Sequence, residues 1–463
     1  MVNPVLPTSF LNSFTINALL QQPESTRVFA VKRRILGGAA CAALAVLSAP
    51  AIGASTPPAP MAFPAAADPD IAAFYAQRRG ALLWLAKGPD SAAMRELFLV
   101  LHRSSLDGFA GGPLIAAQAE GLIARAGNDP AALAAADQLL SSAWVRYVAL
   151  LKRPPEGMVY ADRWIAPKQV SAGQTLMLAG AAPSLADHVR ATANPNSFYT
   201  ALRDAAWTQS QASGLAPDSR LLTSLDRARA FPAHGRYLVV DAASARLFMV
   251  ENGAVADSMK VIVGKPKSQT PMIASVIYYA TLNPYWNVPP DLVRTLIAPR
   301  VLDQGIGYLK AHGYEVLTGF TEDAIELSPS VVDWKSVAAG RDTVRVRQRP
   351  GPGNSMGQIK FGFANDAGVF LHDTPNKDLF AGDGRNLSNG CIRLEDAQRL
   401  GRWLTGGEIS VASTEPEQHL ALPRPIPVYV TYLTAHVDNG QLSFFDDAYG
   451  RDSPPVLAGL ARN

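Results

Sequence analysis

The chain has 463 residues, of which 48% are hydrophobic and 17% charged, so it is long enough for two or three domains with ordinary buried cores. Lysine and arginine together number 42 and aspartate and glutamate 39. This near balance gives no indication of a nucleic-acid-binding protein or of one that binds an acidic partner.

The first 54 residues predict a leader that directs export. Three basic residues at 32–34 precede an apolar run at 35–47, and small residues follow at 49–54. This order is that of a secretory signal peptide, so we expect the protein to be exported. The apolar run is short for a transmembrane helix, and an uncleaved membrane anchor is the alternative.

Two segments of different composition follow the leader. Residues 55–69 are rich in alanine and proline and predict a flexible spacer. Residues 70–235 have mainly helical periodicity and predict a helical scaffold domain.

Helix start signals divide the scaffold domain. Ser91, Pro113 and Asp129 each stand at the expected start of a helix, and two further helices are expected at 196–211 and 218–229. The helix that starts after Asp129 carries apolar residues on one face, which predicts a packed core. These residues are Leu140, Trp144, Tyr147, Val148 and Leu151.

From residue 236 onward, short apolar stretches predict strands instead of helices. They lie at 237–241, 246–251, 258–263, 428–433 and 441–445. The dipeptides Asn252-Gly253 and Asn439-Gly440 stand where tight hairpins need a positive φ, the second between the last two of these strands.

These patterns predict a mainly β domain at residues 236–451. A helix is expected at 395–404, ended by the glycines at 406–407. Residues 291–345 are expected to form an insertion that begins with helix and loop, and residues 452–463 a C-terminal tail. The predicted fold class is therefore a multidomain α and β protein.

Cys391 is the only cysteine outside the leader, and a lone cysteine in an exported protein indicates intermolecular pairing or a reactive thiol. Gly390 directly before it permits a sharp turn. His372 ends a short apolar stretch and can supply the base that a thiol needs at neutral pH. The alternative is a buried apolar cysteine with an unrelated histidine.

The spacing of these residues resembles the signature of the L,D-transpeptidases, the penicillin-insensitive cross-linkers of bacterial peptidoglycan. The signature consists of His372, fifteen intervening residues, Ser388, Gly390 and Cys391, with Arg393 two residues further on. Further matches lie at 283–290, 349–361 and 372–380, and they resemble the large periplasmic branch of that family. The resemblance covers roughly residues 236–451.

The resemblance implies both a fold and a reaction. It implies a helical scaffold followed by a sandwich-like catalytic domain, with a capping insertion over the cleft. Cys391 would attack the carbonyl of the third-position diamino acid in a donor tetrapeptide and release D-alanine. An acceptor amine would then resolve the thioester into a 3-3 cross-link. Carbapenems would acylate the same thiol, and neither a metal nor another cofactor is expected.

Each site residue has an expected role. His372 would act as base and acid, and the backbone N–H groups of Gly390 and Cys391 would bind the oxyanion. Ser388 belongs to the catalytic signature. Asp373 follows His372, but neighbours in a strand point to opposite faces, so a backbone carbonyl is expected to orient the imidazole.

Five residues are expected near the substrate, and Asp373 is one of them. Arg393 and Asn354 are proposed substrate binders, and Trp286 is expected either to line the cleft or, as the alternative, to pack within the fold. Asn389 stands where many family members carry histidine, which bears on acceptor preference. The alternatives are an Arg393 bonded to acidic residues at the start of the following helix and an Asn354 that only shapes a turn.

Three functions remain open at this point. The first is transpeptidation in cell-wall biogenesis and the maintenance of cell shape. The second is hydrolysis of stem peptides by the same cysteine, with water as acceptor, and the third is a non-enzymatic wall-binding scaffold. The expected partners are donor and acceptor stem peptides and other wall-synthesis enzymes, with no nucleic acid.

Overall fold

In the computed structural model, the residues described are 68–127, 129–214, 216–321, 323–409, 414–438 and 440–452. They all belong to one compact unit, residues 64–463. The predicted leader, nearly all of the spacer and all but the first residue of the tail lie outside them. Among the helices of the described ranges, none has the length and apolar character that crossing a membrane requires.

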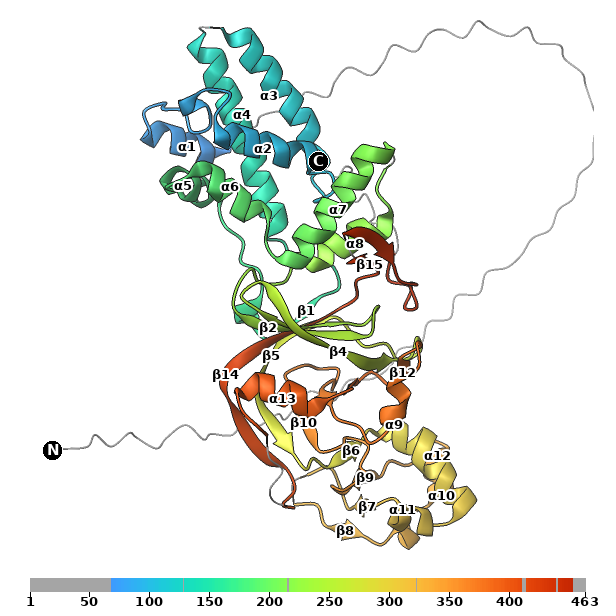
Figure 1. The fold of residues 1–463 in the computed structure, drawn as a ribbon. Coiled ribbons are helices and arrows are strands. Elements are labelled where there is room, and N and C mark those ends of the chain that lie inside the picture. Colours follow the sequence, from blue (N-terminus) through green and yellow to red (C-terminus); the bar gives the residue numbers. More distant parts are fainter. Residues whose placement is uncertain are drawn as a thin grey trace, which may run out of the picture. The chain divides into compact units, whose positions relative to one another are not determined.

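The N-terminal part is helical, as the sequence predicts (Figure 1). Helices α2, α3 and α4 begin at or near Ser91, Pro113 and Asp129, and the side chains of Ser91 and Asp129 accept hydrogen bonds from the first turn of their helices. The helices are α1 (Pro69–Gln77), α2 (Ala92–Arg103), α3 (Gly112–Ala126), α4 (Pro130–Leu151), α5 (Ala172–Ala181), α6 (Leu185–Ala193), α7 (Ser197–Ser213) and α8 (Ser219–Ala228).

Helix α4 carries the apolar face that was expected to form a core. Leu140, Trp144 and Tyr147 are fully buried, and the remaining two residues of that face are buried as well. The buried carboxylate of Asp137 on the same helix accepts hydrogen bonds from backbone N–H groups near Trp84, so it is not left without partners. The predicted packed core is therefore confirmed.

The C-terminal part contains a ten-stranded mixed sheet in the order β1-β5-β10-β11-β13-β4-β3-β2-β14, with β12 paired to β4. Strand β14 pairs with both β2 and β5, so the strands from β5 to β14 form a closed path. The strands are β1 (Val159–Tyr160), β2 (Arg236–Asp241), β3 (Arg246–Glu251), β4 (Ala254–Gly264), β5 (Ile273–Leu282), β10 (Ile359–Phe363), β11 (Leu371–His372), β12 (Asn386–Ser388), β13 (Ile392–Leu394) and β14 (Gln418–Thr431).

The structure confirms the first of the two predicted hairpins and contradicts one arm of the second. Asn252 and Gly253 have φ of 52° and 84° and join β3 to β4, as expected. The later hairpin joins β15 (Ala435–Asp438) to β16 (Gln441–Phe444), so the prediction that residues 428–433 form one of its arms is wrong. That stretch is buried because it lies between β2 and β5 in the main sheet. Asn439 lies outside the described residues.

The insertion has a core of its own, formed by residues such as Val293, Val316 and Val346. Its four strands pair in the order β6-β9-β7-β8, and its helices pack against them (Figure 1). Its elements are β6 (Trp286–Val288), α9 (Pro290–Leu292), a π-helical turn (Val293–Ile297), α10 (Ala298–Gln304), α11 (Gly307–Ala311), β7 (Tyr314–Leu317), β8 (Glu326–Leu327), α12 (Trp334–Ala338) and β9 (Arg345–Gln348). The insertion thus extends a few residues beyond the expected 291–345 at each end and contains strands.

Strands β10, β11 and β13 are adjacent in the main sheet; β11 carries His372 and β13 carries Arg393, while Ser388 ends β12 and Cys391 directly precedes β13. Helix α13 (Ala397–Thr405) follows β13 and ends at Gly406, whose φ is 75°, as the sequence predicts. Strand β11 has only two residues, and its position is fixed by pairing with β10 on one side and β13 on the other. Residues far apart in the sequence therefore lie side by side here.

Candidate active site

Cys391 stands at the end of a tight turn that begins at Ser388. Gly390 has a φ of 118°, which only glycine adopts readily. The Ser388 hydroxyl donates to the carbonyl of Cys391 (2.6 Å) and accepts from the N–H of Gly390 (3.1 Å). Ser388 thus holds the turn that presents the cysteine.

The hydroxyl of Thr270 also stabilises this turn. It is fully buried, donates to the carbonyl of Gly390 (2.8 Å) and accepts from the N–H of Gly264 (2.9 Å). Nothing in the local sequence of Thr270 indicates this role, because the contact joins residues 120 positions apart. Thr270 is a positioning residue that sequence reasoning missed.

The turn leaves one oxyanion donor where two were expected. The N–H of Gly390 is bonded to the Ser388 hydroxyl, whereas the N–H of Cys391 donates to no residue in the described ranges. A donor that is already bonded within the turn is not available to a substrate oxygen. In the resting site the N–H of Gly390 therefore stabilises the turn, and the N–H of Cys391 is the member of the expected pair that remains unbonded among the described residues.

The strand register brings the histidine and the cysteine to one face of the sheet. His372 lies opposite Arg393 in the parallel β11–β13 pair, and the N–H of Ile392 donates to the carbonyl of Phe370 (3.0 Å). Opposite residues share a face, and so do residues two apart in one strand. Cys391 directly precedes β13, and continuing the β11–β13 pairing by one residue places it opposite Phe370 and diagonal to His372.

His372 is only 5% exposed, and its ring is oriented by a backbone carbonyl. Nδ1 lies 2.6 Å from the carbonyl oxygen of Asp373, and since a carbonyl only accepts, Nδ1 carries the proton. Nε2 is then left with the lone pair that a base needs. Burial, followed by the charge of Arg393, lowers the pKa of His372 to about 3, so the imidazole is neutral at neutral pH.

The thiol of Cys391 belongs to a residue that is partly exposed. Its Sγ lies 3.8 Å from the carbonyl oxygen of Gly368. Burial raises the pKa of the thiol above its usual value of 9.0, while a hydrogen bond from the Phe370 backbone and the charges of Arg393 and Lys360 oppose that rise. The resting pair is therefore a neutral thiol beside a neutral imidazole, and not a thiolate beside an imidazolium.

We expect this resting state to be visible in the pH dependence of alkylation. The rate at which the neutral reagent iodoacetamide modifies Cys391 should keep rising through the thiol range, with no step near the usual histidine pKa of about 6.5. The reason is that His372 is already neutral there, so only the thiol changes protonation. Mass spectrometry of the peptide that contains Cys391 measures the rate, and a plateau from about pH 5 to pH 8 would instead indicate a stable thiolate–imidazolium pair.

Asn354 is buried, and its side chain is hydrogen-bonded to the backbone. Its side chain is 1% exposed, and its amide donates to the carbonyls of Pro284, Gln348 and Arg349 at 2.9–3.2 Å. Its oxygen accepts from the N–H of Met356 (2.6 Å). This matches the alternative of a residue that shapes a loop, and it leaves no amide hydrogen for a substrate.

The three other residues that were expected to bind substrate each have a different environment. The carboxylate of Asp373 binds Lys377 (2.7 Å) and the N–H of Gln358 (2.9 Å), so it does not contact the imidazole beside it. Trp286 packs against the core of the insertion. Asn389 is exposed in the turn before the cysteine.

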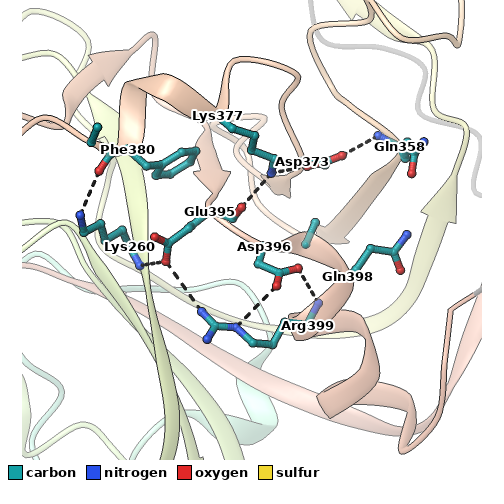
Figure 2. A pocket seen from close by; sticks show the side chains of 11 residues that line it. Lys260, Gln358, Asp373, Lys377, Phe380, Glu395, Asp396, Gln398 and Arg399 are labelled. Atoms are coloured by element: carbon teal, nitrogen blue, oxygen red, sulfur yellow. Dashed lines mark hydrogen bonds and ion pairs between the residues drawn. The ribbon is translucent and has the colours of Figure 1, made fainter.

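A cavity of about 820 Å³ lies next to the site, but neither Cys391 nor His372 lines it. Figure 2 shows Asp373, Lys377 and Glu395 in its wall, with Arg399 bonded to acidic neighbours. Lys377 donates to Asp373 and to the carbonyls of residues 394 and 395 (3.1 and 2.9 Å). It therefore ties the end of β11 to the end of β13.

No group of three histidine, cysteine, aspartate or glutamate residues within the described ranges is arranged to hold a metal ion. The chemistry available to this site is that of a thiol, a neutral base, a backbone N–H and nearby cations. This set suits transfer of an acyl group through a thioester.

Two parts of the chain match known protein families. Residues 235–428 match the family described as the L,D-transpeptidase catalytic domain, and residues 69–205 match a family described as a scaffold domain. A curated relative named "Putative L,D-transpeptidase", from Haemophilus influenzae, is 28% identical over 248 residues. That alignment covers 52% of this chain and 50% of the relative, so the chain spans about half the length of the curated relative it matches.

Two solved structures also show similarity at low identity. An L,D-transpeptidase from Mycobacterium smegmatis is 15% identical with a TM-score of 0.22, and the match covers 43% of this chain and 59% of that chain. L,D-transpeptidase 3 from Mycobacterium tuberculosis, in complex with a faropenem-derived adduct, is 12% identical with a TM-score of 0.21, with coverage of 43% and 61%.

Proposed function

We propose, from the L,D-transpeptidase catalytic domain that this chain carries, that the protein is an exported transferase that forms 3-3 cross-links in peptidoglycan. The observation that supports this most is the register of β11 and β13, which puts a neutral His372 diagonal to Cys391. The proposed location is the periplasm, with the helical domain acting as a scaffold for the catalytic domain.

Acylation begins when Nε2 of His372 takes the thiol proton of Cys391. The thiolate attacks the carbonyl of the third residue of the donor tetrapeptide, and the oxyanion that forms accepts from the N–H of Cys391. The carbon–nitrogen bond then breaks, and His372 returns the proton to the amine of the departing D-alanine. The product is a thioester on Cys391.

Deacylation repeats these steps with a new nucleophile. An acceptor amine from a second stem peptide attacks the thioester carbonyl while His372 removes a proton from it. The carbon–sulfur bond breaks, and the proton returns to the thiolate, so the enzyme ends in its starting state. General acid–base help of this kind contributes roughly 10²- to 10⁴-fold in rate.

Hydrolysis is the second candidate, because water can replace the acceptor amine without any change in the catalytic residues. Incubation with a disaccharide-tetrapeptide, followed by mass spectrometry of the muropeptides, separates the candidates. Cross-linked dimers with release of D-alanine support the transferase. Tripeptide monomers alone would indicate a hydrolase, and unchanged substrate would leave only a wall-binding role.

Arg393 is proposed to bind a carboxylate of the stem peptide. Its guanidinium forms no hydrogen bond or ion pair within the described part of the chain, whereas Glu395 and Asp396, its alternative partners, interact with Arg399. A hydrogen bond to a charged group contributes about 1.5 to 3 kcal/mol. A free guanidinium beside the nucleophile is therefore suited to a charged substrate.

We expect Arg393→Gln to lower kcat/KM for the stem peptide by roughly 10- to 150-fold. The melting temperature should change little, because no structural partner is lost. Alkylation of Cys391 by iodoacetamide should fall much less than kcat/KM, because that reagent has no carboxylate. A variant that melts several degrees lower and loses both reactivities equally would show that Arg393 has a structural role.

A further inference from the structure

We propose that Lys360 and Arg393 together form a carboxylate-binding site around His372, and that this site holds a free carboxylate of the acyl donor next to Cys391. The proposal rests on the proposed function in one respect, the identity of the donor as a stem peptide. The site itself is inferred from geometry and charge.

The register of three adjacent strands places the two cations on either side of His372. Lys360 lies opposite His372 in the antiparallel β10–β11 pair, and His372 lies opposite Arg393 in the β11–β13 pair. Opposite residues point to the same face, so the histidine stands between the two cations. Neighbouring strands are about 4.8 Å apart, so the two cationic residues start roughly 10 Å apart and their long side chains can reach one anion.

Neither cation has an anionic partner in the part of the chain that the structure describes. Within the described ranges, Lys360 forms no ion pair, and its Nζ lies 5.3 Å from the centre of the Phe370 ring. Arg393 likewise has no ion pair there, and burial lowers its pKa. A charged group partly removed from water is costly unless it is paired, so two such cations on one face are complementary to an anion.

The cavity of Figure 2 provides a contrast within the same protein. There Lys377 binds Asp373 at 2.7 Å, and Arg399 lies near Glu395 and Asp396. Those cations are paired with the protein's own carboxylates. Within the part of the chain that the structure describes, Lys360 and Arg393 on the face that carries Cys391 form no ion pair with a carboxylate, so the anion they suit must come from a ligand.

The two cations also act on the base, His372. The charged groups that face His372 are Lys360 from β10 and Arg393 from β13, while the neighbouring Asp373 is bonded to Lys377. Both cations lower the pKa of His372 and so oppose its protonation. A carboxylate bound between them would reduce this repulsion of the imidazolium, and it would equally reduce the stabilisation that the same cations give to the Cys391 thiolate. The two effects on proton transfer oppose each other, so the role assigned to the site is binding of the donor.

Two carboxylates of a donor stem have suitable chemistry. One is the terminal carboxylate of the departing D-alanine, which lies one residue from the scissile carbonyl. The other is a carboxylate on the side chain of the third residue, where the diamino acid carries one. Both are anions close to the atom that Cys391 attacks, and substrates that lack one or the other distinguish them.

The site can be tested with two small reagents and without any peptidoglycan. Iodoacetate and iodoacetamide alkylate the same thiol, but only the first is an anion. Relative to a free thiol in solution, Cys391 should favour iodoacetate, and Lys360→Gln should lower the ratio of the two rates by roughly three- to tenfold. Lys360→Arg, which keeps the charge, should keep most of the preference.

The control is Lys87→Gln, which removes the same charge from an exposed residue in the helical domain and should leave the ratio unchanged. A Lys360→Gln ratio equal to that of the unaltered protein would overturn the proposal. So would an unaltered protein that prefers iodoacetate no more than a free thiol does. Both outcomes are independent of whether the muropeptide assay shows transfer, hydrolysis or no turnover.

The source of the carboxylate is found with modified donors. A tetrapeptide whose C-terminus is amidated should react more slowly than the free acid if the terminal carboxylate is bound, and Lys360→Gln should narrow that difference. If only amidation of the third residue's side chain slows the reaction, the side-chain carboxylate is the ligand. If neither modification slows it, the two cations do not bind the donor.

Discussion

Replacing Cys391 with serine is expected to abolish cross-linked product and covalent modification by a carbapenem. The reaction needs a thiolate as nucleophile and as leaving group, and a serine hydroxyl in the same place is far less acidic. The substitution removes one sulfur atom from a turn held by Ser388 and Thr270, so the fold should be retained. Intact-protein mass spectrometry of the carbapenem adduct and product analysis measure the two effects.

The matched control is Cys41→Ser in the full chain. It makes the same chemical change at the other cysteine, which lies in the predicted leader, and should leave both reactions unchanged. Product formation by the Cys391→Ser variant at close to the native rate would rule out a cysteine mechanism.

His372→Ala is the second substitution with a large expected effect. Loss of the base that moves protons in both half-reactions should lower kcat/KM by roughly 10²- to 10⁴-fold. Iodoacetamide should also react more slowly with Cys391 at neutral pH, because Nε2 no longer takes the thiol proton. Steady-state kinetics and alkylation rates check the two expectations.

Stability must be separated from chemistry here, because His372 is buried and its ring bonds the carbonyl of Asp373. His372→Gln can keep a donor for that carbonyl but provides no base, so it should be as inactive as the alanine variant and melt closer to the native protein. His234→Ala, at an exposed histidine, is the matched control and should be fully active. Native kinetics in the glutamine variant would remove His372 from its proposed role.

Local signals in the sequence were sufficient for much of the fold. Ser91 and Asp129 cap helices because their side chains accept from the first turn, and such capping depends on a few consecutive residues. The hairpin at Asn252 and Gly253 likewise follows from the positive φ that this dipeptide tolerates. Features of this kind can be predicted without tertiary contacts.

Long-range pairing could not be predicted in the same way. Residues 428–433 have the pattern of a hairpin arm, but their burial comes from β2 and β5, which lie more than 140 residues earlier. The same limit applies to Thr270, whose hydroxyl supports a turn 120 residues away. A register between distant strands is set by packing, which local sequence does not contain.

The candidate active site contains both residues that local sequence identifies and residues whose role depends on long-range strand pairing. Cys391 and His372 could be identified from their spacing, because a reactive thiol and its base are unusual residue types in a recognisable pattern. Lys360 could not be recognised as a binding residue, because its proposed role depends on its position opposite His372 and on its forming no ion pair within the described ranges. Asn354 had the opposite outcome, since its loop suggested binding but its amide is bonded to backbone carbonyls.

Trapping of the acyl-enzyme would test the proposed mechanism most directly. The protein is mixed with donor tetrapeptide in the absence of an acceptor and quenched rapidly with acid, and its mass is measured before and after digestion. We predict an increase equal to the tetrapeptide minus D-alanine, located on the peptide that contains Cys391 and released by hydroxylamine as expected of a thioester. Turnover of the donor with Cys391 unmodified at every time point, or an adduct on a different residue, would contradict the mechanism.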